Sequence, residues 1–274
     1  MKDLGRTGFS IALVLSLGVS GVAPCFAAGA EPLAKRQIIS GARQAYYNLS
    51  TLGFMGFQAS ATPNWRLVLK PQFASDPASA KAALNLLSGI HFTVTLSPQG
   101  VAKVTHSGGT APFDPKVAAG YNQIYSGMEQ AMSGFFETWT PFMLGSPFPD
   151  PRSDYQLEQL KNQYVLSYTE QNAAITTTMS KNLVITDSKV ETSDFKSDLR
   201  PQFAPGSHGL LLVGYDTTYV SPSGAGNSQL KVKVDYQELS GFELPRKLNL
   251  DGSFEGRPFS MEMTFGNYRV KKRS

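Results

Sequence analysis

Apolar and polar side chains alternate through the C-terminal part of the chain, and this alternation constrains the fold more than any other feature. From Tyr155 onward the apolar residues recur at every second position, most clearly in two rows: Leu230, Val232, Val234 and Tyr236, then Phe259, Met261, Met263 and Phe265. Successive side chains of a β-strand point to opposite faces of its sheet. With turn signals at Ser223–Gly226 and Asp251-Gly252, the pattern predicts an antiparallel meander with one apolar and one polar face.

The residues before Tyr155 predict helices that cover the apolar face of this sheet. Apolar residues return at helical spacing over residues 32–50. Two further helices are predicted to begin at Asp76-Pro77 and Asp114-Pro115, because aspartate accepts hydrogen bonds from first-turn amides and proline has no amide to leave unpaired. Between them, residues 90–106 alternate and predict a hairpin. Residues 54–61 and 65–69 are predicted to be extended, although the second segment is too short to exclude a buried helix.

The predicted helix 115–139 carries an unusually large stripe of aromatic and thioether side chains. Prolines at 141, 147, 149 and 151 predict that it gives way to a loop over residues 141–153, which is rich in apolar residues. Methionine is flexible and polarisable, so it lines adaptable apolar sites well. The stripe and the start of the loop therefore form the candidate ligand-binding set: Tyr125, Met128, Met132, Phe135, Phe136, Trp139, Phe142 and Met143. The alternative is that these side chains simply form the core.

The N-terminal 30 residues have the order of a secretory signal peptide. Lys2 and Arg6 precede an apolar run over residues 11–19, and small residues follow. That run is about half the length that a membrane-spanning helix needs. Cys25 stands where a lipid-modified cysteine could stand, but the proline before it fits that signal poorly. The sequence therefore predicts an exported, periplasmic protein, with a lipid anchor at Cys25 as the alternative.

The charge balance argues against a nucleic-acid partner. Removing Lys2, Arg6 and Asp3 from the 25 basic and 21 acidic residues leaves 23 and 20, a formal charge of +3. The basic cluster at residues 271–274 is predicted to be a solvated tail. Residues 31–270 contain no repeat or linker and suit one β-rich domain, because such domains often run to about 200–250 residues.

No pattern in the sequence indicates a cofactor, a metal site or a catalytic group. The three histidines, His91, His106 and His208, lie in separate segments without metal-ligand spacing. No Gly-x-Ser-x-Gly motif occurs. Glu129 and Glu137 are predicted to lie on the exposed side of their helix. A hydrolase with a dispersed site stays open as a third possibility.

The order of elements resembles the LolA/LolB-like family of periplasmic lipoprotein carriers. The resemblance covers most of residues 31–270 and is carried at the C-terminus by Val234–Pro245 (VDYQELSGFELP) and Phe265–Val270 (FGNYRV). It implies an α+β fold in which a strongly curved antiparallel sheet, an incomplete β-barrel, has helices covering its concave apolar face. It also implies a hydrophobic cavity that receives acyl chains.

The functional expectation is a non-enzymatic carrier that shelters a lipid or the acyl chain of a lipoprotein. Such a site would gain about 0.8 kcal/mol for each buried methylene group. The alternative is an interaction or scaffold module with a filled core and no ligand, in which the outer face or an edge of the sheet binds a cell-envelope protein.

Overall fold

The computed structural model describes most of the chain: residues 33–109, 115–170, 172–221, 227–254 and 256–273. The predicted signal peptide at residues 1–30, with Cys25, lies outside the described residues, and so do Asp114 and the predicted turn at Ser223–Gly226.

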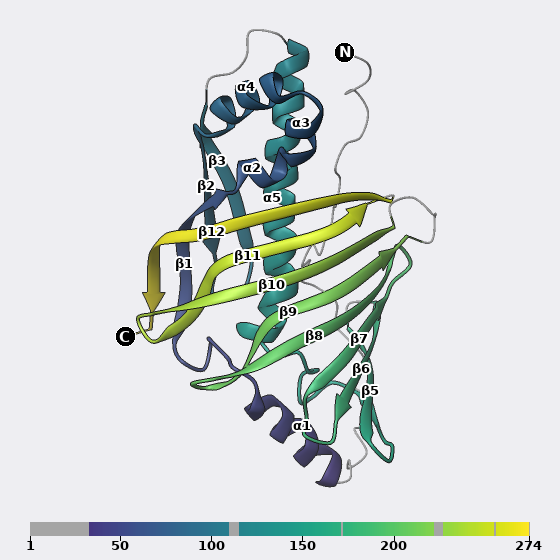
Figure 1. Ribbon diagram of the computed structural model, residues 1–274. Helices are drawn as coiled ribbons and strands as arrows, with labels where there is room; N and C mark the ends of the chain where they lie inside the picture. Colours follow the sequence, from purple (N-terminus) through teal and green to yellow (C-terminus); the bar gives the residue numbers. More distant parts are fainter. Residues whose placement is uncertain (1–32, 110–114, 171, 222–226, 255, 274) are drawn as a thin grey trace.

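One antiparallel sheet of twelve strands dominates the described structure (Figure 1). Its spatial order is β3-β2-β1-β12-β11-β10-β9-β8-β7-β6-β5-β4. The sheet is not closed, because β3 and β4 are its two edges. With the helices it confirms the predicted α+β class. The strands are β1 (Phe54–Pro63), β2 (Ile90–Leu96), β3 (Ala102–Gly108), β4 (Tyr155–Gln159), β5 (Gln163–Glu170), β6 (Ala173–Ser180), β7 (Ile185–Glu191), β8 (Lys196–Gly206), β9 (Gly209–Val220), β10 (Ser228–Leu239), β11 (Phe242–Phe254) and β12 (Arg257–Lys272).

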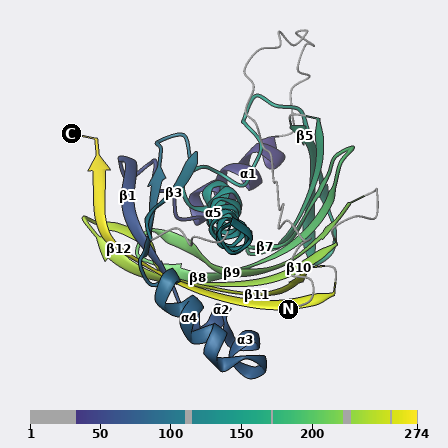
Figure 2. The same cartoon turned by 90° about the horizontal axis from the view of Figure 1, so that it is seen from above.

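In the described residues five helices accompany the sheet: α1 (Leu33–Ala45), α2 (Trp65–Val68), α3 (Lys70–Ser75), α4 (Pro77–Leu87) and α5 (Pro115–Met143). Figure 2 shows that the sheet bends and that α5 lies on the inside of the bend. The sheet face turned toward α5 is called the inner face below. Within the described part of the chain, no helix combines the length and the apolar character needed to cross a membrane.

Strand register separates the two faces of the sheet. On the inner face, directly paired residues form a row across the strands from β4 to β10: Leu157, Leu166, Thr177, Ser188, Leu199, Thr217 and Leu230. Five of these seven side chains are buried. The neighbouring row on the outer face consists of Thr178, Asp187, Arg200, Asp216, Lys231 and Asp251. The predicted division into an apolar and a polar face is therefore confirmed.

Helix α1 is anchored to the sheet by two tyrosines that follow it. The Tyr46 hydroxyl accepts a hydrogen bond from the Ile185 amide at 2.7 Å and donates one to the Leu183 carbonyl at 3.1 Å. The Tyr47 hydroxyl accepts a hydrogen bond from the Glu243 amide at 2.8 Å. Because each tyrosine reaches a different strand, α1 bridges distant parts of the sheet.

The helix starts and the hairpin were predicted correctly. Helix α4 begins at Pro77, and the Asp76 side chain accepts a hydrogen bond from the Ser79 amide at 3.1 Å. Helix α5 begins at Pro115. Strands β2 and β3 pair in register from Ile90 to Gly108.

One predicted boundary was wrong, and one segment left open between strand and buried helix begins as a helix. Residues 65–69, predicted to be extended, begin with the short helix α2, where the Asn64 side chain accepts a hydrogen bond from the Leu67 amide at 3.3 Å. The predicted loop at 141–153 begins too early, because α5 includes Pro141, Phe142 and Met143. Proline removes one helical hydrogen bond. That loss is tolerated here because the helix ends two residues later, where the Leu144 amide bonds the Thr140 carbonyl at 2.9 Å.

The predicted turn at Asp251-Gly252 and the predicted tail also differ from the structure. Gly252 lies inside β11 and pairs with Phe259. A Cβ at this position would lie 2.4 Å from the Gln229 carbonyl oxygen. Glycine is therefore required here because two strands approach closely, and not because the chain turns. Strand β12 continues through Lys272, and the Arg273 amide bonds the Gly53 carbonyl at 2.8 Å. The exposed basic side chains therefore stand on an ordered backbone.

Candidate functional site

The structure buries seven of the eight predicted ligand-binding residues. Met132, Phe136, Trp139 and Met143 have no exposed surface, and Tyr125 is the one member that is partly exposed. The Phe136 ring lies 5.8 Å from both Phe57 on β1 and Phe265 on β12, measured between ring centroids. This side of α5 therefore packs against the part of the sheet around β1 and β12. The assignment of these residues to a ligand site stays a prediction.

A short chain of hydrogen bonds fixes the C-terminal half of α5 to the sheet. Trp139 Nε1 donates to the Tyr236 hydroxyl at 2.9 Å, and that hydroxyl donates to the Leu212 carbonyl. Met143 Sδ accepts from the Leu212 amide at 3.4 Å. Burial raises the pKa of Tyr236 well above its ordinary value, so the phenol stays protonated and can donate. The arrangement orients a tryptophan and offers no reactive group.

The opposite flank of α5 is polar, which the sequence analysis missed. Thr138 lies within hydrogen-bonding reach of the hydroxyls of Tyr215 and Tyr219 on β9. Burial raises the pKa of the neighbouring Glu137 carboxyl to about 7. The prediction that Glu137 lies on an exposed face is therefore wrong. Glu137 is covered because the sheet bends around both sides of α5 (Figure 2). Periodicity along the helix cannot reveal that bend.

A second apolar surface lies on the inner face of strands β4 to β8. Two residues beyond the buried row, paired residues continue toward the rim of the sheet: Tyr155, Tyr168, Ile175, Val190 and Ser197. Each of these residues is half-buried. Burial, with a smaller effect from Glu170, raises the pKa of Tyr168 to about 12. The backbone of α5 approaches the sheet most closely at β3 and β9, so this surface lies beyond its closest contacts. We call it the wing surface.

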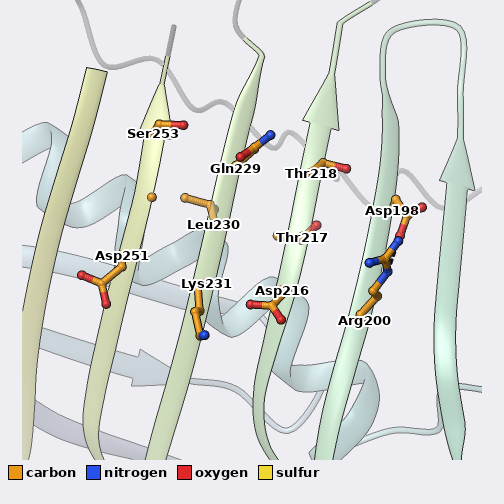
Figure 3. A pocket seen from close by; sticks show the side chains of 11 residues that line it. Asp198, Arg200, Asp216, Thr217, Thr218, Gln229, Leu230, Lys231, Asp251 and Ser253 are labelled. Atoms are coloured by element: carbon orange, nitrogen blue, oxygen red, sulfur yellow. Dashed lines mark ion pairs between the residues drawn. The ribbon is translucent and has the colours of Figure 1, made fainter. Parts of the chain in front are cut away.

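The outer face carries a shallow hollow of about 570 Å³ (Figure 3). Helical ribbon lies behind the strands in this view, and the side chains of Arg200, Asp216 and Lys231 project on the near side. The lining is mostly polar: Asp198, Arg200, Asp216, Thr217, Thr218, Gln229, Leu230, Lys231, Asp251, Gly252 and Ser253.

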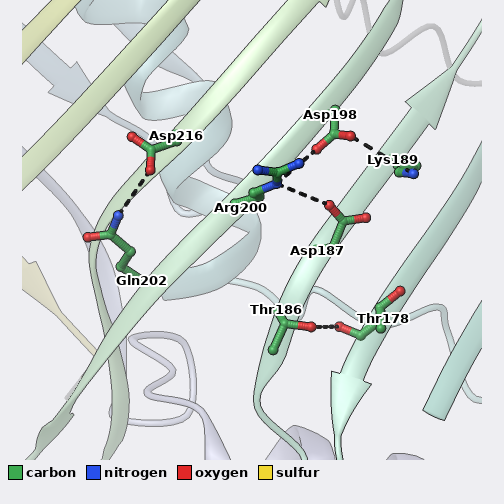
Figure 4. Close-up of polar contacts among 8 residues, drawn as sticks. All are labelled: Thr178, Thr186, Asp187, Lys189, Asp198, Arg200, Gln202 and Asp216. Carbon is green, nitrogen blue, oxygen red and sulfur yellow. Dashed lines mark hydrogen bonds and ion pairs between the residues drawn. The ribbon is translucent and has the colours of Figure 1, made fainter. Parts of the chain in front are cut away.

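Ion pairs hold the side chains beside this hollow (Figure 4). Arg200 Nε lies 3.8 Å from carboxylate oxygens of both Asp187 and Asp198, and Lys189 lies 3.9 Å from Asp198. Partial burial, followed by the nearby Asp198 carboxyl, raises the pKa of Asp187. Opposite charges thus neutralise one another along the outer face, which favours a polar partner over a strongly charged one.

The histidines form no metal site in the described residues, where no group of three histidine, cysteine or acidic side chains converges. His106 Nδ1 lies 2.8 Å from Glu129 Oε1, which ties the edge strand β3 to α5. Glu129, predicted to lie on the exposed side of its helix, is therefore partly buried and in contact with His106. The His106 ring also lies 4.9 Å from the Tyr125 ring.

Comparisons of the chain with protein-family models, with curated proteins and with solved structures found no match.

Proposed function

We propose that this protein is a periplasmic carrier that shelters the hydrocarbon chain of an amphiphile between α5 and the wing surface. In this proposal the open sheet is an incomplete β-barrel, and α5 covers part of its concave apolar face. The supporting observation is the inner-face row on β4 to β8, three of whose five members are leucines, which continues as half-buried residues toward the rim beyond the closest contacts of α5.

The two sides of the proposed site have different roles. The side of α5 that carries Met132 is fixed to β1 and β12 by interlocking rings and forms a wall. The wing surface meets the ligand, and its half-buried side chains can change rotamer without breaking a strand pair. Because β4 is an edge strand, a chain can enter along that side of the sheet. The seven buried members of the predicted set then belong to this wall, with the partly exposed Tyr125 at its end.

Displacement of a fluorescent fatty acid by unlabelled chains of ten, twelve and fourteen carbons tests this proposal. A buried methylene contributes about 0.8 kcal/mol, so two more carbons should tighten binding roughly tenfold. Affinity that does not depend on chain length, or no displacement at all, would reject a hydrocarbon site.

Point variants locate the site. Ile175→Asp places a charge on the wing surface and should abolish displacement. Thr176→Asp is the matched control, because the next residue of the same strand points to the outer face. Equal loss in both variants would indicate a general effect on β6.

The proposed location depends on residues 1–30 acting as a signal. The mass of the protein recovered from the cell envelope distinguishes the two forms of export. Cleavage near residue 30 removes Cys25, whereas a lipoprotein begins at a diacylated Cys25. Full-length protein confined to the cytoplasm would contradict export.

The polar hollow of the outer face supports a second candidate, an interaction module that binds a cell-envelope protein. A photo-crosslinking residue at Thr218 on the outer face and another at Ile175 on the wing surface separate the two. The carrier should give lipid adducts from position 175. An interaction module should give protein adducts from position 218 and none from 175.

A further inference from the structure

Gln130 and Glu137 lie on the flank of α5 that turns away from Met132. Seven residues span two helical turns, so the two side chains leave the same flank about 10 Å apart along the helix axis. Of the two, Glu137 lies near Tyr219 on β9. This flank is distinct from the stripe that packs on β1 and β12.

One oxygen of each side chain is buried without a partner. Gln130 Oε1 and Glu137 Oε2 have almost no contact with solvent, and neither has a hydrogen-bond partner in the part of the chain that the structure describes. An unsatisfied buried acceptor costs about 1–3 kcal/mol, and native proteins contain few of them. Two on one flank of one helix indicate that a hydrogen-bond donor from outside the described chain belongs there.

The electrostatics favour a donor that carries positive charge. Burial alone accounts for the raised pKa of Glu137, so no cation of the described chain offsets its loss of hydration. A cation beside a desolvated carboxylate restores the charged form. A carboxylate or phosphate head group would instead meet two acceptor oxygens.

We infer that Glu137 Oε2 receives the ammonium head group of an amphiphile whose hydrocarbon chain lies on the wing surface. This inference rests on the proposed function and adds the class of head group. Tyr219 of β9 borders this position, and Gln130 Oε1 offers a second acceptor farther along α5.

Three twelve-carbon amphiphiles with different head groups test the inference: dodecylammonium, dodecanol and dodecanoate, each below its critical micelle concentration at pH 8. The wild-type protein should bind dodecylammonium at least about tenfold more tightly than dodecanol, because hydrogen bonds to charged groups are worth about 1.5–3 kcal/mol. Dodecanoate should bind most weakly.

Glu137→Gln should remove the preference for dodecylammonium while dodecanol still binds. Glu129→Gln is the matched control, since Glu129 lies on the same helix but pairs with His106, and it should keep the preference. An unchanged preference in Glu137→Gln, or tighter binding of dodecanoate by the wild type, would overturn the head-group inference alone. Failure of all three amphiphiles to bind would overturn the carrier proposal together with it.

Discussion

At the scale of single residues, Glu137 makes stability depend on pH. Burial raises its pKa from 4.5 to about 7 in the folded protein. The folded state therefore holds this proton more tightly than the unfolded chain does. The stability contributed by the protonated carboxyl is fully present below pH 4.5 and is lost as the pH rises through about 7.

Glu137→Gln should consequently raise the free energy of unfolding at pH 8 and leave it nearly unchanged at pH 4.5. We expect a gain on the order of 1 kcal/mol, less than full burial would give, because solvent screens a half-buried side chain. Urea denaturation at both pH values measures the difference. An equal effect at the two pH values would mean that the carboxyl ionises normally in the folded protein.

Tyr236 joins α5 to the sheet through its hydroxyl. Tyr236→Phe would leave the Trp139 indole N–H and the Leu212 carbonyl without this partner. Each unsatisfied buried group costs about 1–3 kcal/mol, so the variant should lose roughly 2–4 kcal/mol of stability. Tyr164→Phe on β5, which keeps the ring beneath Lys181, should cost about 0.5 kcal/mol or less. Thermal denaturation that does not distinguish the two variants would refute the role of the hydroxyl.

Substitutions of Met132 test whether this side of α5 is a packed wall or a mobile lining of a cavity. It has no exposed surface, so Met132→Asp would bury an unpaired charge and should prevent stable folding. Met132→Leu conserves volume and should cost less than about 1.5 kcal/mol. A folded Met132→Asp protein with a normal circular dichroism spectrum would show that this side of α5 is not a packed wall.

At the scale of elements, patterns with a local cause were predicted well. Period-two alternation predicted the antiparallel strands, and the Asp-Pro dipeptides predicted the starts of α4 and α5. The errors arose where a contact distant in sequence decides the structure. Gly252 was predicted to be in a turn, whereas it lies where the Gln229 carbonyl approaches β11. Glu137 was predicted to be exposed, because nothing in the helix itself indicates the bend of the sheet around it.

Gly252 gives an element-scale prediction about the central strands. Gly252→Ala would place a Cβ 2.4 Å from a backbone oxygen of the neighbouring strand and should destabilise the sheet by about 1–3 kcal/mol. Gly134→Ala on α5 meets no atom within 4 Å and should be neutral or stabilising by up to about 1 kcal/mol. Chemical denaturation of the pair checks the sign of each change. A neutral Gly252→Ala would show that β10 and β11 can separate freely.

At the scale of the whole molecule, the proposed carrier depends on how one helix divides the space inside an open sheet. The side of α5 with Met132 is occupied by rings from β1 and β12. The other flank presents two acceptor oxygens that have no partner among the described residues, and Glu137 lies near Tyr219 on β9. The candidate site predicted from the sequence was drawn from one stripe of the helix, whereas the proposed site takes its chain-binding surface from strands that pair far from that stripe.

Native mass spectrometry of protein purified from cell envelopes tests the central claim most directly. The wild type and Thr176→Asp should carry adducts with the mass of an amphiphile, and Ile175→Asp should carry none. Bare protein in all three samples, or the same adducts on Ile175→Asp as on the wild type, would contradict a hydrocarbon site on the inner face of β4 to β8.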